Sequence, residues 1–176
     1  HMRTTLPVEE VSALDKGIIV SRAYFDPDDR TTAITAAEQG DTVVVRLTIV
    51  VPNSLHYAVI DDPLPAGLEA IDLSLRTSQV VGAPDRYLIE ESDFGYSGWG
   101  WWYFDHVELR DEKVVISANY MPAGTYEYVY LARASTIGEF KTIPPSAFEF
   151  YFPEVYGRGD GSIFEVVPQE TLPEVE

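Results

Sequence analysis

Side chains that could carry out catalysis are few and scattered in this sequence. Beyond the first residue, the histidines are His56 and His106, which lie in separate predicted strands far apart along the chain. A zinc or catalytic site would need partners that converge on one of them, so each is predicted to be a strand residue paired to a neighbouring carboxylate. Ser97 lies in a G-Y-S-G segment that departs from the G-x-S-x-G nucleophile elbow by one position. We therefore predict no catalytic residue, and only a polar pocket that joins a histidine to several carboxylates would indicate an enzyme.

Clustered aspartates offer the oxygen ligands that calcium prefers. Asp26, Asp28 and Asp29 form such a group around Pro27, but the spacing is not that of a recognised calcium loop. Proline presets φ and aspartates bond their own backbone, so the pattern predicts a turn, with these aspartates as weak candidate metal ligands. The pair Asp61–Asp62 is likewise predicted to cap a turn. No cofactor is expected.

Aromatic residues and glycines fill residues 94–104, which read FGYSGWGWWYF. Such a segment could stack on sugar rings, contact another protein, or close the end of a β-sandwich. The candidates for an interaction face are Trp99, Trp101, Trp102, Tyr103 and Tyr151. Further on, residues 158–160 spell the Arg-Gly-Asp attachment tripeptide, which recurs by chance and is a weak indication of adhesion.

Composition narrows the class of protein. The 176 residues suit one domain, and a hydrophobic content of 45% suffices for a core. The formal charge of −17 argues against nucleic acid and against an anionic membrane as partners. Cysteine is absent, which excludes disulfides, thiolate metal sites and an internal Cys-Gln thioester in this chain. No apolar run reaches membrane-spanning length.

Short alternating runs of apolar and polar residues predict a series of strands. The predicted strands are residues 17–25, 42–51, 57–60, 68–75, 106–109, 114–117, 125–131, 139–143 and, at an edge, 147–152. With polar turns between them, they predict an all-β fold: an antiparallel two-sheet sandwich of the immunoglobulin-like kind. Three of the later strands and the edge segment are expected to share one sheet.

The alternation is lost between Arg76 and Tyr103, which predicts one long irregular connection with at most a short helix near residues 83–91. We expect residues 1–16 to be a tag remnant and a linker or edge segment. We expect residues 17–168 to form the single sandwich domain and residues 169–176 to be a frayed tail. His1-Met2 looks like a remnant of tag cleavage, so we expect the chain to have been excised from a longer protein.

Five ordered motifs carry a resemblance to a known family. They are D-P-L-P-A-G-L-E from Asp62, H-x-E-x-R-D-x-x-V from His106, A-G-T-Y-x-Y-x-Y-x-x-R-A from Ala123, G-x-F-x-x-x-P-P from Gly138 and F-Y-x-P-E-V-x-G-R from Phe150. Together they resemble the carboxy-terminal domain of bacterial alpha-2-macroglobulin-like proteins, over residues 18–167. The resemblance implies a macroglobulin-like sandwich.

This resemblance also implies a function. Proteins of the family are large protease traps of the cell envelope, periplasmic or extracellular, in which cleavage of a bait region triggers a rearrangement that cages the protease. The domain would carry neither bait nor thioester; it would pack against the thioester-bearing region and help gate the rearrangement. Its partners would be neighbouring domains and, through the parent protein, proteases. The alternative is a stand-alone extracellular module, carbohydrate-binding or adhesive, on the same fold.

Overall fold

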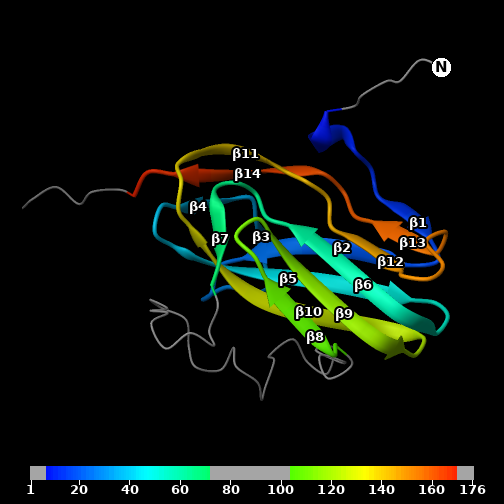
Figure 1. Cartoon of the computed structure of the whole chain (residues 1–176). Coiled ribbons are helices and arrows are strands. Elements are labelled where there is room, and N and C mark those ends of the chain that lie inside the picture. The colour runs from blue at the N-terminus through cyan, green and yellow to red at the C-terminus, as the bar shows by residue number, and fades with distance from the viewer. Residues whose placement is uncertain (1–6, 72–103, 170–176) are drawn as a thin grey trace, which may run out of the picture.

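The computed structural model describes residues 7–71 and 104–169 (Figure 1). Its elements are the 3-10 helix η1 (Val8–Glu10) and the strands β1 (Leu14–Lys16), β2 (Ile19–Phe25), β3 (Ala33–Ile34), β4 (Ala36–Glu38), β5 (Thr42–Val51), β6 (Leu55–Pro63), β7 (Leu68–Ala70), β8 (His106–Leu109), β9 (Lys113–Met121), β10 (Gly124–Ala134), β11 (Gly138–Thr142), β12 (Ser146–Glu149), β13 (Tyr156–Arg158) and β14 (Ser162–Val167). The two longest strands are β10 and β5, and β5 consists largely of β-branched residues, which favour strands.

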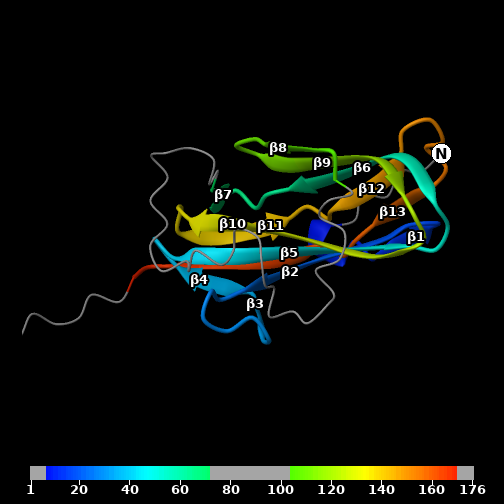
Figure 2. The same ribbon diagram turned by 90° about the horizontal axis from the view of Figure 1, so that it is seen from below.

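Two large antiparallel sheets form the layers of the sandwich. One sheet has six strands in the order β1-β13-β12-β6-β9-β8, and the other has five in the order β3-β2-β5-β10-β7. Figure 2 shows β6, β8 and β9 in one layer above β2, β5 and β10 in the other. The register between β5 and β10 runs without interruption from Val51 opposite Gly124 to Thr42 opposite Arg133. The predicted all-β sandwich is confirmed.

A smaller third sheet was not predicted. Its order is β11-β14-β4, and the pairing of β14 with β4 is parallel, unlike the antiparallel ladders of the large sheets. Phe164 and Val166 of β14 are buried in the same core as Leu47 of β5 and Ile60 of β6. The third sheet therefore belongs to the same packed unit as the two large ones.

Two predictions about strand partners are wrong. The hairpin of β8 and β9 belongs to the six-stranded sheet, whereas β10 belongs to the five-stranded sheet and β11 to the third, so these strands do not share one sheet. The β12 strand is not an edge but lies between β13 and β6. A period-two pattern shows which residues share a face, but it does not specify which strands pair across the chain.

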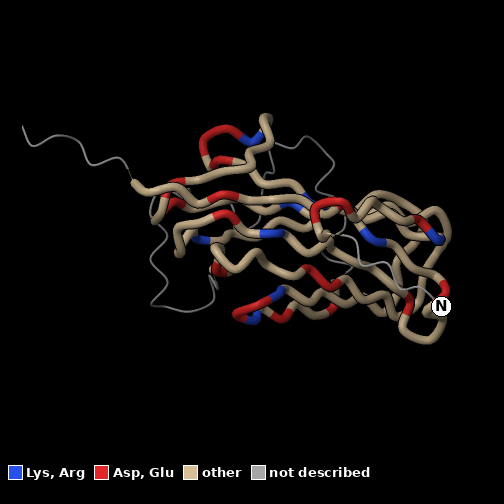
Figure 3. The backbone as a smooth tube through the Cα atoms, turned by 90° about the horizontal axis from the view of Figure 1, so that it is seen from above, with Lys and Arg blue, Asp and Glu red and all other residues tan. Residues whose placement is uncertain are grey.

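The long connection predicted over residues 76–103, including the possible helix at 83–91, lies outside the described residues. In the described part the chain has no helix long and apolar enough to cross a membrane. Charged residues occur in both layers, with acidic residues more frequent than basic ones (Figure 3).

Candidate functional site

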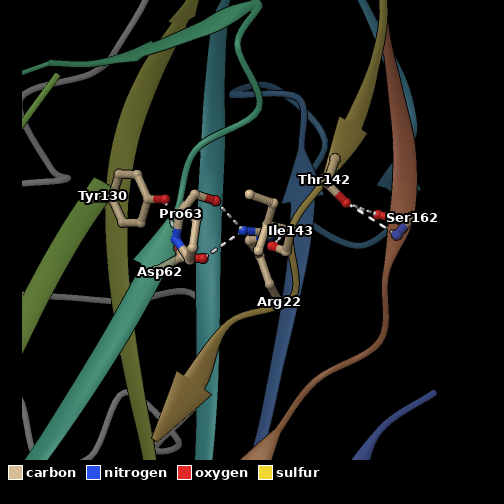
Figure 4. A network of polar contacts seen from close by, with 7 residues as sticks. All are labelled: Arg22, Asp62, Pro63, Tyr130, Thr142, Ile143 and Ser162. Atoms are coloured by element: carbon tan, nitrogen blue, oxygen red, sulfur yellow. Dashed lines mark hydrogen bonds and ion pairs between the residues drawn. The ribbon is translucent and has the colours of Figure 1, made fainter. Parts of the chain in front are cut away.

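A buried ion pair joins the two large sheets. Arg22 of β2 places its Nη1 atom 2.5 Å from Asp62 Oδ1 of β6, and the side chains are 3% and 0% exposed. The hydroxyl of Tyr130, from β10, donates a 2.7 Å hydrogen bond to Asp62 Oδ2. Figure 4 shows these side chains pointing toward one another between the strands. Each Asp62 oxygen thus has a partner, as a buried carboxylate requires. We call Arg22, Asp62 and Tyr130 the inter-sheet clamp.

The clamp extends to the third sheet through backbone carbonyls. Arg22 donates from Nη1 to the Pro63 oxygen at 2.7 Å and from Nη2 to the Ile143 oxygen at 2.9 Å. Ile143 directly follows β11 and leads toward β12. Beside it, the Ser162 amide of β14 donates to the Thr142 hydroxyl at 3.1 Å (Figure 4). One guanidinium therefore connects the two large sheets with the segment that directly follows β11 of the third.

Burial governs the electrostatics of the clamp. Desolvation raises the pKa of Asp62, and the Arg22 charge and the Tyr130 hydroxyl oppose that rise in part. Burial and the neighbouring Asp62 raise the pKa of Tyr130 well above its usual range, which keeps the hydroxyl protonated as a donor. Desolvation lowers the pKa of Arg22, but Asp62 and the nearby tyrosines outweigh it, so the net change is upward. Because neither charged group reaches solvent, the clamp has a structural role.

The prediction that Asp61 and Asp62 cap a turn is wrong. Strand β6 runs through both residues and ends at Pro63. Asp61 pairs with Val115 of β9 and its carboxylate lies 3.2 Å from the Lys113 ammonium, whereas Asp62 faces the core. An Asp-Asp-Pro sequence is typical of a turn. Here the segment stays in the sheet, because buried Arg22 requires a carboxylate as its partner.

The two histidines lie in strands but do not gather partners for catalysis. His56 is on β6, where its amide donates to Glu149 Oε1 at 2.8 Å and its ring centroid lies 5.0 Å from that of Tyr120. His106 is on β8, opposite Ser117. The Glu149 carboxylate therefore accepts a hydrogen bond from the backbone amide of His56. Within residues 7–71 and 104–169, no group of three or more His, Asp or Glu side chains is arranged to hold a metal ion.

A shallow pocket opens beside the β4–β5 connection. Its volume is about 280 Å³, and it is lined by Asp26, Ile34, Ala36, Ala37, Glu38, Asp41, Thr42 and Val167. Its lining contains neither His56 nor His106. It is therefore not the pocket around a histidine that was named as the indication of an enzyme.

The acidic segment after β2 forms the predicted turn. Asp26 Oδ1 accepts the Asp28 amide at 2.7 Å, and Asp29 Oδ1 accepts the Thr31 amide at 3.0 Å and the Thr31 hydroxyl at 2.6 Å. Aspartates in turns commonly bind the backbone in this way. One oxygen each of Asp26 and Asp29 is thus used by the turn itself, and we do not propose a calcium site here.

Asp29 is expected to titrate at unusually low pH. The Thr31 hydroxyl and amide lower the pKa of Asp29 from 3.8 to about 2. Because the folded pKa is depressed, the turn's contribution to stability is present above about pH 3.8 and is lost as the pH falls through about 2. A carboxyl ¹³C NMR titration should show an Asp29 midpoint near that lower value, and Thr31→Val should move the midpoint upward. A midpoint at the ordinary value in the unchanged chain would contradict the hydrogen-bonded turn.

Most of the predicted interaction face lies outside the described residues. This holds for Trp99, Trp101, Trp102 and Tyr103, whereas Tyr151 is described and is 65% exposed. The alternation over 147–152 predicted a strand, but β12 ends at Glu149, and the chain then turns, with a hydrogen bond from the Phe152 amide to the Glu149 oxygen. The end of the ladder leaves three successive aromatic residues outside the sheet.

Exposed aromatic side chains gather at this turn. Among the described residues, the large hydrophobic side chains with high exposure include five aromatic ones: Tyr57, Tyr120, Phe150, Tyr151 and Phe152. The Tyr151 ring lies edge-on to Tyr57 at 5.1 Å and to Phe150 at 5.3 Å between centroids. The turns between β5 and β6, β9 and β10, and β12 and β13 all lie at the same end of the sandwich (Figures 1 and 2). We call these five residues the aromatic tip.

Tyr57 has an unusual backbone conformation. Its φ of 55° is the one positive φ among the described residues other than glycine. His56 pairs with Tyr120 and Ala58 with Ala118, so Tyr57 occupies an irregular point in the ladder, where two successive side chains turn outward. The left-handed conformation costs a non-glycine residue about 1–2 kcal/mol.

Replacing this tyrosine should therefore cost little. In Tyr57→Gly, relief of about 1 kcal/mol of backbone strain should offset a similar loss of ring contacts. The matched variant Tyr120→Gly, on the facing strand with an ordinary φ, should lose about 1 kcal/mol or more. Urea unfolding of both variants measures the difference. Equal losses would show that Tyr57 is not strained.

The Arg-Gly-Asp tripeptide is engaged within the chain. Arg158 donates from Nη2 to the Ser12 oxygen at 3.0 Å, and Asp160 Oδ1 accepts the Ala13 amide at 2.8 Å. The Gly159 amide donates to the Pro145 oxygen at 2.8 Å. The tripeptide thus holds the N-terminal segment beside β13, and it is not presented as a free attachment loop.

Known structures identify the class of protein to which this sandwich belongs. The chain is similar to Escherichia coli alpha-2-macroglobulin activated by porcine elastase, with a TM-score of 0.75 and 25% identity over 90% of this chain and 14% of that one. A native E. coli fragment spanning domain MG7 to the C-terminus shares the fold, with a TM-score of 0.70 and 24% identity over 92% of this chain and 25% of that one. The class is that of β-sandwich domains from alpha-2-macroglobulins.

Sequence comparison specifies the family. Residues 17–154 match the bacterial alpha-2-macroglobulin MG10 domain. An alpha-2-macroglobulin homolog from a Nostoc species is 30% identical over 135 residues, which are 73% of this chain and 6% of that protein. The chain belongs to the bacterial alpha-2-macroglobulin MG10 domain family. It spans between 6% and 9% of the length of the bacterial alpha-2-macroglobulins it matches.

Proposed function

We propose that this chain is the non-catalytic carboxy-terminal sandwich domain of a large bacterial alpha-2-macroglobulin that traps proteases. In this proposal it packs against the thioester-bearing region and helps gate the rearrangement that follows cleavage. The observation that carries the proposal is the family match over residues 17–154. The E. coli fragment from domain MG7 to the C-terminus contains a domain of the same fold.

The clamp supports a gating role on physical grounds. A domain that transmits a rearrangement must move as one body, because a change at one face reaches the other only through packed elements with discrete arrangements. Arg22 joins β2, the end of β6 and the segment after β11 through contacts of 2.5–2.9 Å. Buried charge pairs of this kind resist shearing, since separating them would leave a charge without a partner.

The proposal also specifies partners and location. Neighbouring domains of the same chain are the direct partners, and proteases are partners of the whole parent protein. This chain has no cysteine, so the thioester would lie elsewhere in the parent. By analogy with the family, the parent works in the cell envelope, as a periplasmic or extracellular protein.

A capture assay on the full-length parent tests the proposal. The parent is mixed with elastase or trypsin, the proteases named for the solved E. coli proteins, and the mixture is passed over a gel-filtration column. We expect protease activity on a small peptide substrate to elute with the parent, with the parent cut once. Protease that elutes alone beside an intact parent would contradict the proposal. A stand-alone carbohydrate-binding module would then be tested by a glycan screen of the isolated chain.

A further inference from the structure

We infer that residues 7–16 form a releasable strap, which detaches from the sandwich by rotation at Gly17 while the sandwich itself stays folded. In the parent protein, release of the strap lengthens the connection ahead of the domain when the parent rearranges. Detachment is a property of this chain alone. Its use in the parent rests on the proposed function, which supplies the rearrangement.

The strap lies on the surface and buries none of its side chains. Residues 7–17 are all exposed or half-buried, whereas the next residue, Ile18, is 0% exposed and belongs to the core. The family match also begins at residue 17. Segments that bury few apolar contacts open at a lower cost in free energy than the core of the same domain. The strap can therefore open without the strands that follow it.

Polar contacts hold the strap against one edge of the domain. Strand β1 pairs with β13 (Figure 1), and η1 lies against β11 and β14. The Gly161 amide donates to the Val11 oxygen at 2.8 Å. The Glu9 carboxylate lies 3.1 Å from the Lys141 ammonium, and the Lys141 side chain is 59% exposed, so this ion pair contributes little to stability. Water can replace these contacts once the strap has left, because the groups that they join are then at the surface.

Gly17 provides the hinge. Its φ is 101°, a left-handed conformation that glycine adopts without steric cost. The exposed end of β1 lies on one side of it and the buried Ile18 on the other. The Gly17 amide donates to Asp15 Oδ1 at 2.8 Å, a local hydrogen bond that closes the bend. Because glycine has a wide range of φ and ψ, rotation at this residue can swing the strap outward while Ile18 stays in the core.

A second glycine indicates that the sequence makes room for the closed strap. The φ of Gly161 is not positive, so its backbone conformation does not require glycine. A Cβ atom at Gly161 would overlap the Val8 carbonyl oxygen, and the next nearest atoms, the Val8 carbonyl carbon and Glu9 Cα, also belong to the strap. A side chain at this position would therefore displace the strap before it disturbed the sandwich.

Release of the strap has a use in a long parent. The chain covers 25% of the E. coli fragment from domain MG7 to the C-terminus, so most of that fragment lies outside the domain of this fold. An extended segment as long as the strap spans about 33 Å, at ~3.3 Å per residue. A closed strap holds the domain close to whatever precedes it in the parent, whereas an open strap adds this length to the connection. Moving elements are drawn from the parts of a structure with low local stability, as the strap is.

Hydrogen exchange followed by mass spectrometry tests the release in the 176-residue chain. We expect the amides of residues 8–16 to be protected from exchange roughly 100-fold less than those of β5. Gly161→Ala should remove most of the remaining protection of the strap and leave β5 and β10 unchanged. Asp160→Ala, which removes the acceptor of the Ala13 amide, should act in the same direction more weakly. The matched control is Gly124→Ala, where an added Cβ meets only ordinary contacts, and it should change neither region.

Two results in the isolated chain would overturn the inference. Protection of residues 8–16 equal to that of β5 would show that the strap opens only when the whole domain unfolds. Loss of protection in β5 together with the strap, in both Gly161→Ala and Asp160→Ala, would show that the sandwich does not survive the release.

The same measurement on the full-length parent, before and after elastase is added, tests the use of the strap. We expect exchange in residues 8–16 to rise several-fold after cleavage, with β5 unchanged. A parent that captures the protease without this rise would overturn release in the parent and leave the trap function intact. A strap that opens in the isolated chain, beside a parent that captures no protease, would support the strap and contradict the trap function.

Discussion

Asp62→Ala is expected to lower the free energy of unfolding by about 3–5 kcal/mol, the usual cost of leaving a buried charge without its partner. Arg22 is 3% exposed, and Asp62 is the carboxylate paired with it. The same change also leaves the buried Tyr130 hydroxyl without its acceptor. Urea unfolding of the chain, followed by near-UV circular dichroism, measures the loss.

The neighbouring ion pair is a matched control. Asp61 and Lys113 lie 3.2 Å apart and are about a third exposed, so Asp61→Ala should cost less than about 1 kcal/mol. A double replacement, Arg22→Met with Asp62→Leu, should recover most of the stability, because apolar residues of similar size often replace a buried ion pair without loss. If Asp62→Ala costs no more than Asp61→Ala, the clamp does not hold the sheets together.

Gly157→Ala is expected to have the second large effect. A Cβ atom at Gly157 would lie 2.1 Å from the Ile18 backbone oxygen and 2.8 Å from the Ile18 carbonyl carbon. Neither atom can move unless the start of β2 moves away from β13, which lies between β1 and β12 in the six-stranded sheet. Overpacking against backbone should cost about 3 kcal/mol.

Gly124 offers the comparison for this variant. Its nearest neighbour to an added Cβ is Tyr126 Cε2 at 3.7 Å, an ordinary contact, and its φ is not positive. Gly124→Ala should therefore leave the free energy of unfolding almost unchanged or raise it slightly. A thermal unfolding series with both variants measures the contrast. Equal stability of Gly157→Ala and Gly124→Ala would show that β2 and β13 are less closely packed than described.

The strands could be predicted because their signal is local. Residues 42–51 form β5 over the whole predicted range, and the hairpin of β8 and β9 forms around the charged segment that was expected to turn. The alternation of apolar and polar residues shows which side chains share one face of a strand, and this local pattern is enough to predict the strand. The division of strands among three sheets depends on pairing between distant segments, for which a single sequence has no local signal.

The inter-sheet clamp was not predicted from the sequence, although the alternation along β2 indicated that Arg22 would be buried. Alternation along β2 places Arg22 on the same face as Ile18, Val20 and Tyr24, which are buried. An arginine on an apolar face requires a buried carboxylate, so the strand pattern already demanded a partner such as Asp62. The aspartate was instead predicted in a turn because proline follows it.

The aromatic tip was predicted in part. Tyr151 was proposed as a contact residue from its type, but the alternation of Phe148, Phe150 and Phe152 suggested a continuing strand. Three backbone hydrogen bonds within residues 149–155 close the turn after Glu149, and the aromatic residues that follow are exposed. Tyr57 joins them through an irregular backbone conformation that a tyrosine rarely adopts, so no sequence rule would have indicated it.

The size of the native polypeptide tests the central claim most directly. An antibody raised against this chain is used on a blot of the envelope, secreted and soluble fractions of the source organism, before and after a protease is added. We expect a single band many times larger than 19.7 kDa in the envelope or secreted fraction, and cleavage of that band by the protease. A band near 19.7 kDa would contradict the claim that this chain is a domain of a large protease trap.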